Sequence, residues 1–380
     1  MGNITDDIRA DLEDFDTRPF GETDSLALSQ LAYARMPDNV PRHREPTDDA
    51  GDGGRAPGAG AMVPLRDMLR AECYDDMFGK VWSPPMNVDL LRAMCESPRW
   101  RKLRVGEYVD EFDPETTKQF SACTFDLGDG ALYVAYRGTD SSVVGWKEDF
   151  AMAFRRPVAS QEAATRYLGD IAARWQGAIM VGGHSKGGNL AVYAAANAPD
   201  GVQRRIGAVY SHDGPGFDEA FFASPGYARI APKISKSVPE SSIIGMLFET
   251  REHVEDGYTV VRSDGASIMQ HFALNWQVDH GRFAHADGLS ASARYLARTI
   301  NDWMAKYDDE HRRRFIENLF AIFEAGGYAT FGELSSHWTQ SLPLMVGAAR
   351  GIDAEDRDVI LAVVKGLAAT AATSVIPSHQ

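Results

Sequence analysis

AIMVGGHSKGGNLAVYAAANA, residues 178–198, is the stretch of sequence that decides the fold. It begins with a short apolar run that is typical of a buried strand, and it ends in an alanine-rich run that favours a helix. Between them stands a Gly-x-Ser-x-Gly sequence with Ser185 at its centre. A sharp strand-to-helix turn lets a serine hydroxyl project from the sheet edge, and flanking glycines let neighbouring backbone pass closely. Ser185 is therefore the candidate nucleophile, and a simple helix cap is the plainer alternative.

Strand and helix patterns alternate on both sides of this stretch. The expected strands lie at 120–127, 131–136, 178–182, 206–211, 242–248 and 258–262. Gly128-Asp129-Gly130 joins the first two strands and suits a tight turn. The helices expected between the later strands lie at 161–175 and 187–198. Strands that alternate with crossover helices form a parallel sheet, so the pattern predicts an α/β protein of the α/β-hydrolase fold, with a mostly parallel central sheet flanked by helices.

Three regions are expected along the chain: a mostly helical N-terminal region at 1–115, a catalytic core at 116–290 and a helical C-terminal region packed on the core at 291–380. Further helical patterns lie at 25–34, 65–78, 88–95, 293–306, 313–325 and 359–372. Residues 42–61 are rich in Gly, Pro and Asp and have few bulky apolar side chains, which predicts a flexible surface loop. This loop and the helical regions are candidates for a lid.

Composition excludes several classes of function. The formal net charge is −15, from 54 acidic and 39 basic residues, which opposes binding to phosphate backbones, so we expect no nucleic-acid partner. No apolar run approaches the roughly 18 to 20 residues that span a bilayer, and the acidic N-terminus lacks the features of a secretory signal. These features, with three cysteines far apart in sequence, predict a cytoplasmic protein with reduced thiols and no stable membrane insertion.

A serine hydroxyl needs a base to remove its proton, and in this fold the base is a histidine that follows the acid in sequence. His271 is the best placed, because a short polar loop, SDGAS, joins it to the last expected strand. A structural histidine at a helix start is the alternative for His271. Four other downstream histidines compare less well, because they lie at a strand end, in a charged run or beyond the last strand; they are His212, His253, His280 and His285.

The acid that orients the imidazole is less sharply indicated. Asp213 directly follows the expected strand at 206–211, where it would reach a histidine at the carboxyl edge of the sheet. An aspartate before Gly-Pro is also a common turn residue, which is the alternative reading. Glu240, Glu249 and Asp264 remain rivals for the acid.

The oxyanion of a tetrahedral intermediate needs two donors near the serine. One is normally the backbone N–H of the residue after the nucleophile, here Lys186, and the other comes from a loop after an earlier strand. Thr139, in the segment YRGTD that follows ALYVA, would supply the second donor through its N–H and hydroxyl, unless this segment is a simple turn. The Lys186 side chain has a second reading, as a cation that favours anionic acyl groups or phosphate esters, beside that of an ordinary surface lysine.

Several motifs of the sequence resemble those of known lipase families. RGTD, followed by Trp146 and Asp149 and then GGHSKGGNLA, resembles the class 3 lipases over residues 131–276. MGNITD, GHSKGGNLAVYAA, DGPGF, PESSIIGML and QHFALNWQV resemble a bacterial family of uncharacterised lipase-like α/β-hydrolases over almost the whole chain. The resemblance implies Ser185 as nucleophile, His271 as base, and Thr139 with Lys186 at the oxyanion hole.

The acid departs from the class 3 pattern. Those lipases have Asp at the position of Ser237 in Lys236-Ser237-Val238-Pro239, so their acid cannot be carried over. Asp213 instead resembles the acid of animal pancreatic-type lipases, which precedes a Pro-containing turn.

The sequence thus predicts a serine esterase or lipase-like enzyme that forms an acyl-enzyme from a small acyl ester or lipid. No P-loop, zinc-binding or dinucleotide motif is present, and the chemistry requires no cofactor or metal. A thioesterase or peptidase with the same residues is the nearest alternative, because these residues do not dictate the leaving group. A non-catalytic hydrolase-like scaffold is the alternative from another class.

Overall fold

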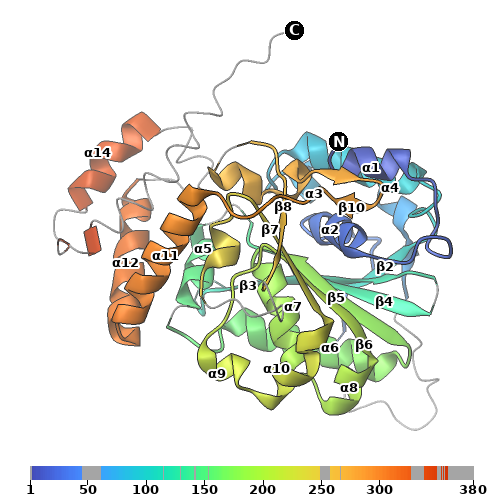
Figure 1. Ribbon diagram of the computed structural model, residues 1–380. Coiled ribbons are helices and arrows are strands. Elements are labelled where there is room, and N and C mark those ends of the chain that lie inside the picture. Colours follow the sequence, from blue (N-terminus) through green and yellow to red (C-terminus); the bar gives the residue numbers. More distant parts are fainter. Residues whose placement is uncertain are drawn as a thin grey trace.

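The computed structural model describes residues 2–44, 61–113, 115–128, 130–140, 143–152, 154–248, 257–265, 267–326 and 338–348, together with 352, 354, 356 and 357. Its centre is an eight-stranded sheet with the strand order β1-β2-β3-β4-β5-β6-β7-β8 (Figure 1). The strands from β1 to β4 pair antiparallel, and those from β4 to β8 pair parallel. The expected mostly parallel sheet flanked by helices is confirmed.

The eight strands are β1 Val63–Pro64, β2 Arg104–Asp113, β3 Lys118–Asp126, β4 Ala131–Tyr136, β5 Ala178–His184, β6 Ile206–His212, β7 Ile234–Pro239 and β8 Thr259–Val261; β9 Val278–Asp279 and β10 Arg282–Phe283 form a separate pair. The α-helices are α1 Ile4–Ala10, α2 Glu22–Leu31, α3 Tyr74–Phe78, α4 Pro84–Glu96, α5 Val143–Ala151, α6 Ala159–Arg174, α7 Lys186–Asn197, α8 Asp200–Arg205, α9 Glu219–Phe222, α10 Pro225–Ile230, α11 Ala291–Lys306, α12 Asp309–Ala325 and α14 Trp338–Ala348. Short 3₁₀ helices are η1 Leu65–Met68, η2 Ala71–Cys73, η3 Ala231–Lys233, η4 Ile244–Met246, η5 Ser267–His271 and η6 Ala273–Asn275.

The sequential strand order places the crossover helices on one face of the sheet. Figure 1 shows α6, α7, α8 and α10 together below the sheet, as expected when every parallel connection has the same hand. Val134 and Val209 point into this lower core, whereas Tyr133 and Tyr210 point into the core on the opposite face. A parallel sheet is buried on both faces, so the opposite face needs another cover. The N-terminal helices α1, α2 and α4 supply it.

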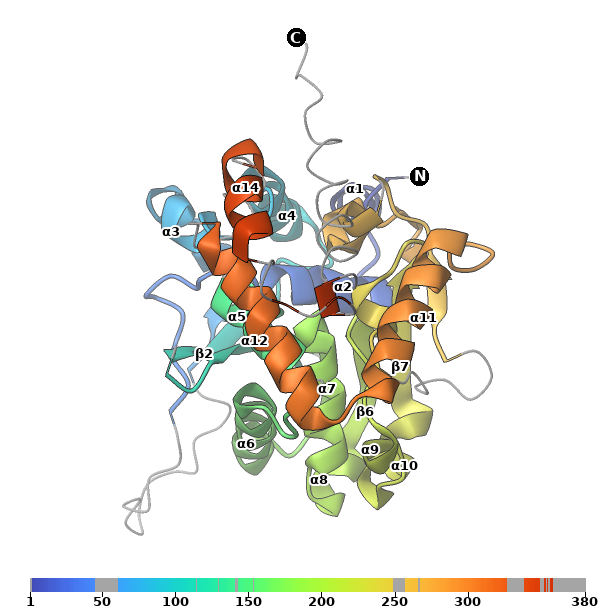
Figure 2. The same ribbon diagram turned by 90° about the vertical axis from the view of Figure 1, so that its left-hand side faces the viewer.

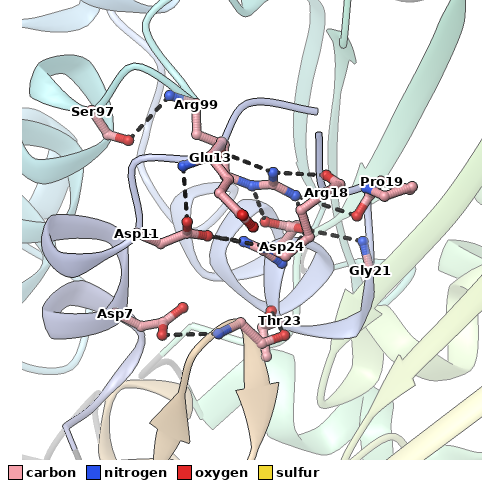
Figure 3. A network of polar contacts seen from close by, with 11 residues as sticks. Asp7, Asp11, Glu13, Arg18, Pro19, Gly21, Thr23, Asp24, Ser97 and Arg99 are labelled. Atoms are coloured by element: carbon pink, nitrogen blue, oxygen red, sulfur yellow. Dashed lines mark hydrogen bonds and ion pairs between the residues drawn. The ribbon is translucent and has the colours of Figure 1, made fainter. Parts of the chain in front are cut away.

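A buried charge network fixes these N-terminal helices (Figure 3). The Arg99 guanidinium is 1 % exposed and donates to both carboxylate oxygens of Asp24, at 2.8 and 2.7 Å. It also donates to the backbone oxygens of Glu13 and Arg18, while the Arg18 side chain pairs with Asp11. A buried guanidinium is tolerated only when its donors are satisfied, so this network ties the segment between α1 and α2 to the end of α4.

The sheet begins earlier in the sequence than expected. Strands β1 and β2 lie within residues 1–115, the region expected to be mostly helical. The far half of β2 alternates exposed and half-buried residues and is mostly acidic, so it lacks the apolar run that identifies an inner strand. The expected boundaries of the three regions remain predictions.

The expected strand at 242–248 is wrong, because this segment contains the 3₁₀ turn η4 instead. Strand β7 was not expected, since its sequence ISKSVP is largely polar. Its polar residues are nevertheless buried, and the Ser237 hydroxyl lies 2.8 Å from Nδ1 of His212. Polar pairing inside the core thus replaces the apolar run that a sequence pattern can detect.

The expected helices at 25–34, 88–95, 161–175, 187–198, 293–306 and 313–325 are confirmed as α2, α4, α6, α7, α11 and α12, whereas 65–78 is broken into η1, η2 and α3. Helix α12 packs on α5, and their contact contains Phe320 and Phe150 with ring centroids 5.7 Å apart (Figure 2). The expected helix at 359–372 and most of the expected loop at 42–61 lie outside the described residues.

Candidate active site

Ser185 stands on a strained turn between β5 and α7. Its backbone has φ +58° and ψ −132°, a combination that residues other than glycine rarely adopt. The neighbouring glycines make the turn possible, since a Cβ on Gly183 would lie 2.2 Å from the backbone of Gly187. A Cβ on Gly187 would lie 2.1 Å from the oxygen of Tyr136. The turn therefore presses α7 against the ends of β4 and β5.

The Ser185 hydroxyl does not cap α7. It forms no hydrogen bond with any other residue of the described part of the chain, and the residue is 4 % exposed. The backbone N–H of Ser185 donates to the oxygen of His212 at 2.8 Å, which ties the turn to β6. These contacts leave the hydroxyl available for chemistry and rule out the helix-cap reading.

His271 and Asp213 lie together at the carboxyl edge of the sheet. Nδ1 of His271 lies 2.6 Å from Oδ2 of Asp213, and the Asp213 side chain is fully buried. The other carboxylate oxygen accepts from the Ser242 hydroxyl at 2.5 Å and from the Gly245 N–H at 3.1 Å. Charge-assisted hydrogen bonds of this kind hold a carboxylate in one orientation. With the ring proton on Nδ1, Nε2 of His271 is free to accept a proton.

Asp213 is held in place by its backbone as well. Its φ of +51° lies in the left-handed region, and its N–H donates to the oxygen of Ser237 at 2.7 Å. Gly245 must be glycine at this place, because a Cβ there would lie 2.2 Å from Oδ1 of Asp213. Ser242 and Gly245 belong to the segment expected to be a strand, which is why sequence reasoning missed their contact with the acid.

The roles of His184 and Tyr33 at this site were not predicted from the sequence either. The His184 ring contacts the His271 ring, with centroids 4.6 Å apart, and Nε2 of His184 lies 2.7 Å from the backbone oxygen of His271. The Tyr33 hydroxyl lies 2.9 Å from Nδ1 of His184. Because His184 directly precedes Ser185, this contact places the His271 ring beside the serine turn. The only sequence signal was the position of His184 inside the Gly-x-Ser-x-Gly motif.

The competing histidines have other environments. His212 is a buried core residue, with Nδ1 2.8 Å from the Ser237 hydroxyl and Nε2 2.9 Å from the Ser25 hydroxyl. Burial, and then the nearby His184, lower the pKa of His212 to about 3. His280 and His285 are exposed, and His253 lies outside the described residues.

The rival acids in the described part of the chain, Glu240 and Asp264, form no hydrogen bond with the His271 side chain. The exposed Asp264 accepts from Gln277, at 2.8 Å. Glu240 joins β8 and the start of α11 through its backbone, and Glu249 lies outside the described residues. Of the four expected acids, the structure brings Asp213 to His271.

The segment that carries Thr139 lies beside the serine turn. A Cβ on Gly138 would lie 2.6 Å from the backbone oxygen of His184, so the two backbones pass closely. The Thr139 hydroxyl donates to Oδ2 of Asp149 at 2.5 Å, which commits its proton to that carboxylate. The N–H of Thr139 is therefore its remaining donor toward the serine, rather than the N–H and hydroxyl together as expected.

The Lys186 side chain is fully buried. Its Nζ donates to Oε2 of Glu148 at 3.0 Å and to the oxygen of Gln119 at 2.8 Å. Both readings of this side chain as a surface cation are wrong, because its charge is neutralised inside the protein. The Lys186 N–H stands at the first position of α7, where helix geometry provides no acceptor.

A hollow of about 430 Å³, which includes space open to solvent, lies along α7. Asn189, one helical turn after Ser185, lines it together with the aromatic side chains of Tyr193, Phe217, Phe221 and Phe248. Residues four apart lie on the same side of a helix, about 6 Å apart along its axis. The hollow thus begins near the serine turn, and its lining combines these aromatic side chains with the charged Arg155, Arg156 and Asp218.

Among the described residues, no group of three or more His, Cys, Asp and Glu side chains is arranged to hold a metal ion. No helix within the described ranges is long and apolar enough to cross a membrane. What the site offers chemically is a hydroxyl that caps no helix, an imidazole, a buried carboxylate and backbone N–H groups.

Comparisons with known proteins were informative at the family level. The family model described as Mbeg1-like matches residues 94–321, more than half of the chain. No curated protein matches the sequence. One similar solved structure is M37 lipase, which is 15 % identical; the match covers 61 % of this chain and 71 % of that chain, with a TM-score of 0.36. Another is the Rhizomucor miehei lipase propeptide complex, also 15 % identical; the match covers 61 % of this chain and 83 % of that chain, with a TM-score of 0.29. Both TM-scores lie below 0.5, so the relation to class 3 lipases stays a prediction.

Proposed function

The chain belongs to the Mbeg1-like family, and we propose that it is a serine hydrolase of the α/β-hydrolase fold that cleaves carboxylic esters through an acyl-enzyme. The observation that carries this proposal is the buried His271–Asp213 pair beside Ser185, a serine held at φ +58° without a capping role. Strain of roughly 1 to 3 kcal/mol at one residue persists only where the surrounding structure enforces it, and such residues cluster at functional sites.

Each residue has a definite role in the proposed reaction. The Ser185 hydroxyl attacks the ester carbonyl while Nε2 of His271 accepts its proton, and the same nitrogen returns the proton to the leaving alcohol. Asp213 keeps the His271 ring proton on Nδ1 and stabilises the positive imidazolium. A water molecule then repeats these steps on the acyl-enzyme and releases the acid.

The oxyanion forms where the N–H groups of Thr139 and Lys186 converge in this proposal. Lys186 contributes through its backbone alone, because its ammonium is paired with Glu148. Asp149 accepts from the Thr139 hydroxyl and so restricts the loop that carries the Thr139 N–H. Donors fixed in advance stabilise the developing charge without reorganisation at the moment of reaction.

The acyl chain of the substrate is proposed to occupy the hollow along α7. The aromatic side chains of its lining suit an apolar chain. Small acyl esters or lipids are accordingly the proposed substrates.

Labelling by a fluorophosphonate probe tests the proposal. Wild type should be labelled, Ser185→Ala should not, and His271→Ala and Asp213→Asn should react at least about 100-fold more slowly. Ser211→Ala is the matched control, since Ser211 is a buried serine on β6 whose hydroxyl has no partner among the described residues. Labelling that survives in Ser185→Ala would overturn the assignment of the nucleophile. A folded wild type that resists the probe would instead favour a binding scaffold.

A further inference from the structure

A series of hydrogen bonds joins the end of α2 to the buried acid. The Tyr33 hydroxyl lies 2.9 Å from Nδ1 of His184, and Nε2 of His184 lies 2.7 Å from the backbone oxygen of His271. His271 then reaches Asp213 at 2.6 Å. Tyr33 follows the last residue of α2 by two positions, and β5 supplies His184. The series therefore runs from the N-terminal helices through the sheet to the imidazole.

One tautomer of His184 satisfies both of its contacts. The backbone oxygen of His271 can only accept, so Nε2 of His184 carries the ring proton and Nδ1 accepts from the Tyr33 hydroxyl. Burial, and then the nearby His271, lower the pKa of His184 to about 3, so its ring is neutral at neutral pH. In the other tautomer, the Nε2 lone pair would face the carbonyl oxygen, and the contact that holds the His271 backbone would be lost.

Tyr33 has the properties of a fixed donor. Burial is the main cause that raises the pKa of its hydroxyl well above the ordinary value, so the hydroxyl keeps its proton. A Cβ on Gly138 would lie 2.0 Å from the Tyr33 oxygen, which shows how closely the loop before Thr139 passes this hydroxyl. Tyr33 thus contacts the β5 side and the oxyanion side of the proposed site at once.

The helix that precedes Tyr33 is held firmly in place. Asp24 in its first turn accepts both hydrogen bonds from the buried Arg99 (Figure 3). Ser25 contacts Nε2 of His212 at 2.9 Å and the Tyr133 hydroxyl at 2.7 Å. An anchored helix can deliver a hydroxyl with the accuracy that a catalytic geometry requires.

We propose that Tyr33 is a positioning residue of the active site, which acts through the ring of His184 to hold the His271 backbone and so aim its imidazole at Ser185. The inference rests on the proposed hydrolase function. It assigns a catalytic purpose to the N-terminal helices, which would otherwise only cover the second face of the sheet.

The test compares two tyrosines that each lose one buried hydroxyl facing the same region. Tyr33→Phe removes the donor to His184. Tyr133→Phe is the matched control, because the Tyr133 hydroxyl contacts Ser25 and Ser29 of α2, at 2.7 and 2.9 Å, and not His184. Both variants are assayed for kcat and KM on 4-nitrophenyl esters, for the rate of fluorophosphonate labelling, and by ¹⁵N NMR spectra that report histidine tautomers.

The expected result is that Tyr33→Phe lowers kcat and the labelling rate by about tenfold at unchanged KM, as loss of one buried hydrogen bond can do. The NMR spectra should show His184 still as the Nε2–H tautomer, because the His271 oxygen can only accept, but with a shifted Nδ1 signal and shifted ring signals of His271. Tyr133→Phe, which removes one contact of α2 but leaves the Arg99–Asp24 and Ser25–His212 contacts, should lower kcat far less than Tyr33→Phe and leave the His184 Nδ1 signal unchanged. His184→Gln, which keeps an N–H of similar reach, should retain more activity than His184→Leu.

Two outcomes overturn the proposal: Tyr33→Phe behaves like Tyr133→Phe in kcat and labelling, or the His184 and His271 ring signals of Tyr33→Phe match those of wild type. Failure of the hydrolase assignment looks different. Wild type would then lack labelling and turnover, while the NMR comparison alone would still decide whether Tyr33 holds the His184 and His271 rings in place.

Discussion

Nζ of Lys186 lies 3.0 Å from Oε2 of Glu148, and neither side chain is more than 2 % exposed. This ion pair joins the residue after the proposed nucleophile to α5, which follows the loop that carries Thr139. Glu148 also accepts from the Gln119 N–H and from Ser160, so its carboxylate is fully engaged. The pair therefore ties the starts of α7 and β3 to α5 beneath the proposed oxyanion hole.

Removing one partner of this pair should cost more stability than removing both. Lys186→Met leaves the Glu148 carboxylate buried without its cation, and we expect the free energy of unfolding to fall by about 3 to 5 kcal/mol. The double variant Lys186→Met with Glu148→Gln should recover part of this loss, because the Glu148 charge is removed with its cation and only the second carboxyl near Nζ, Asp149 at 3.6 Å, remains. Urea denaturation measures both effects. Equal losses in the single and double variants would contradict this account of the pair.

Ser185 is expected to trade stability for function. Both Ser185→Ala and Ser185→Gly lose the hydroxyl, but only glycine adopts φ +58° without strain. Ser185→Gly should therefore be more stable than Ser185→Ala by about 1 kcal/mol, after allowing for the greater chain entropy of glycine when unfolded. Thermal or urea unfolding checks the order. Ala297→Gly, at a buried position inside α11, is the control and should lower stability.

Asp149 predicts a pH dependence of stability. Burial is the main cause that raises its pKa to about 6, against an ordinary value of 3.8, while Lys186 and Thr139 oppose this effect. Between about pH 4 and pH 6 the unfolded chain has lost the proton that the folded protein keeps. This carboxyl should therefore lower the free energy of unfolding as pH rises through that window, by up to about 3 kcal/mol.

Asp149→Asn isolates this contribution, because the amide does not titrate. We expect the stability of wild type, relative to the variant, to fall as the pH rises from about 4 to about 6.5. Urea denaturation curves at several pH values provide the measurement. A difference between the two proteins that stays constant across this window would show that Asp149 is not the group responsible.

The hollow along α7 predicts a change in substrate preference. Tyr193 lines it and stacks on Phe221, with ring centroids 5.7 Å apart. Tyr193→Ala enlarges the apolar space, so kcat/KM for long-chain esters should rise relative to acetate esters by about tenfold. Tyr295→Ala removes a tyrosine that is 74 % exposed on α11 and should leave the ratio unchanged. An unchanged ratio in Tyr193→Ala would place the acyl chain elsewhere.

The sequence alone was enough to predict the serine turn, most of the helices and the parallel strands around Ser185. These features follow from local patterns: an apolar run, a glycine-flanked turn and helical periodicity. It also favoured His271 and Asp213 as partners of Ser185, because their positions after successive strands place them at one sheet edge.

Only the tertiary structure decided the contacts between distant segments. Asp213 was separated from its rivals by the approach of His271, and Lys186 proved to be buried because Glu148 and Gln119 surround its ammonium. Strand β7 was hidden by polar residues that find partners inside the core, and Tyr33 reaches His184 across 151 positions of sequence. Hydrogen bonds between residues so far apart leave no periodic trace in sequence, because their geometry exists only after the chain has packed.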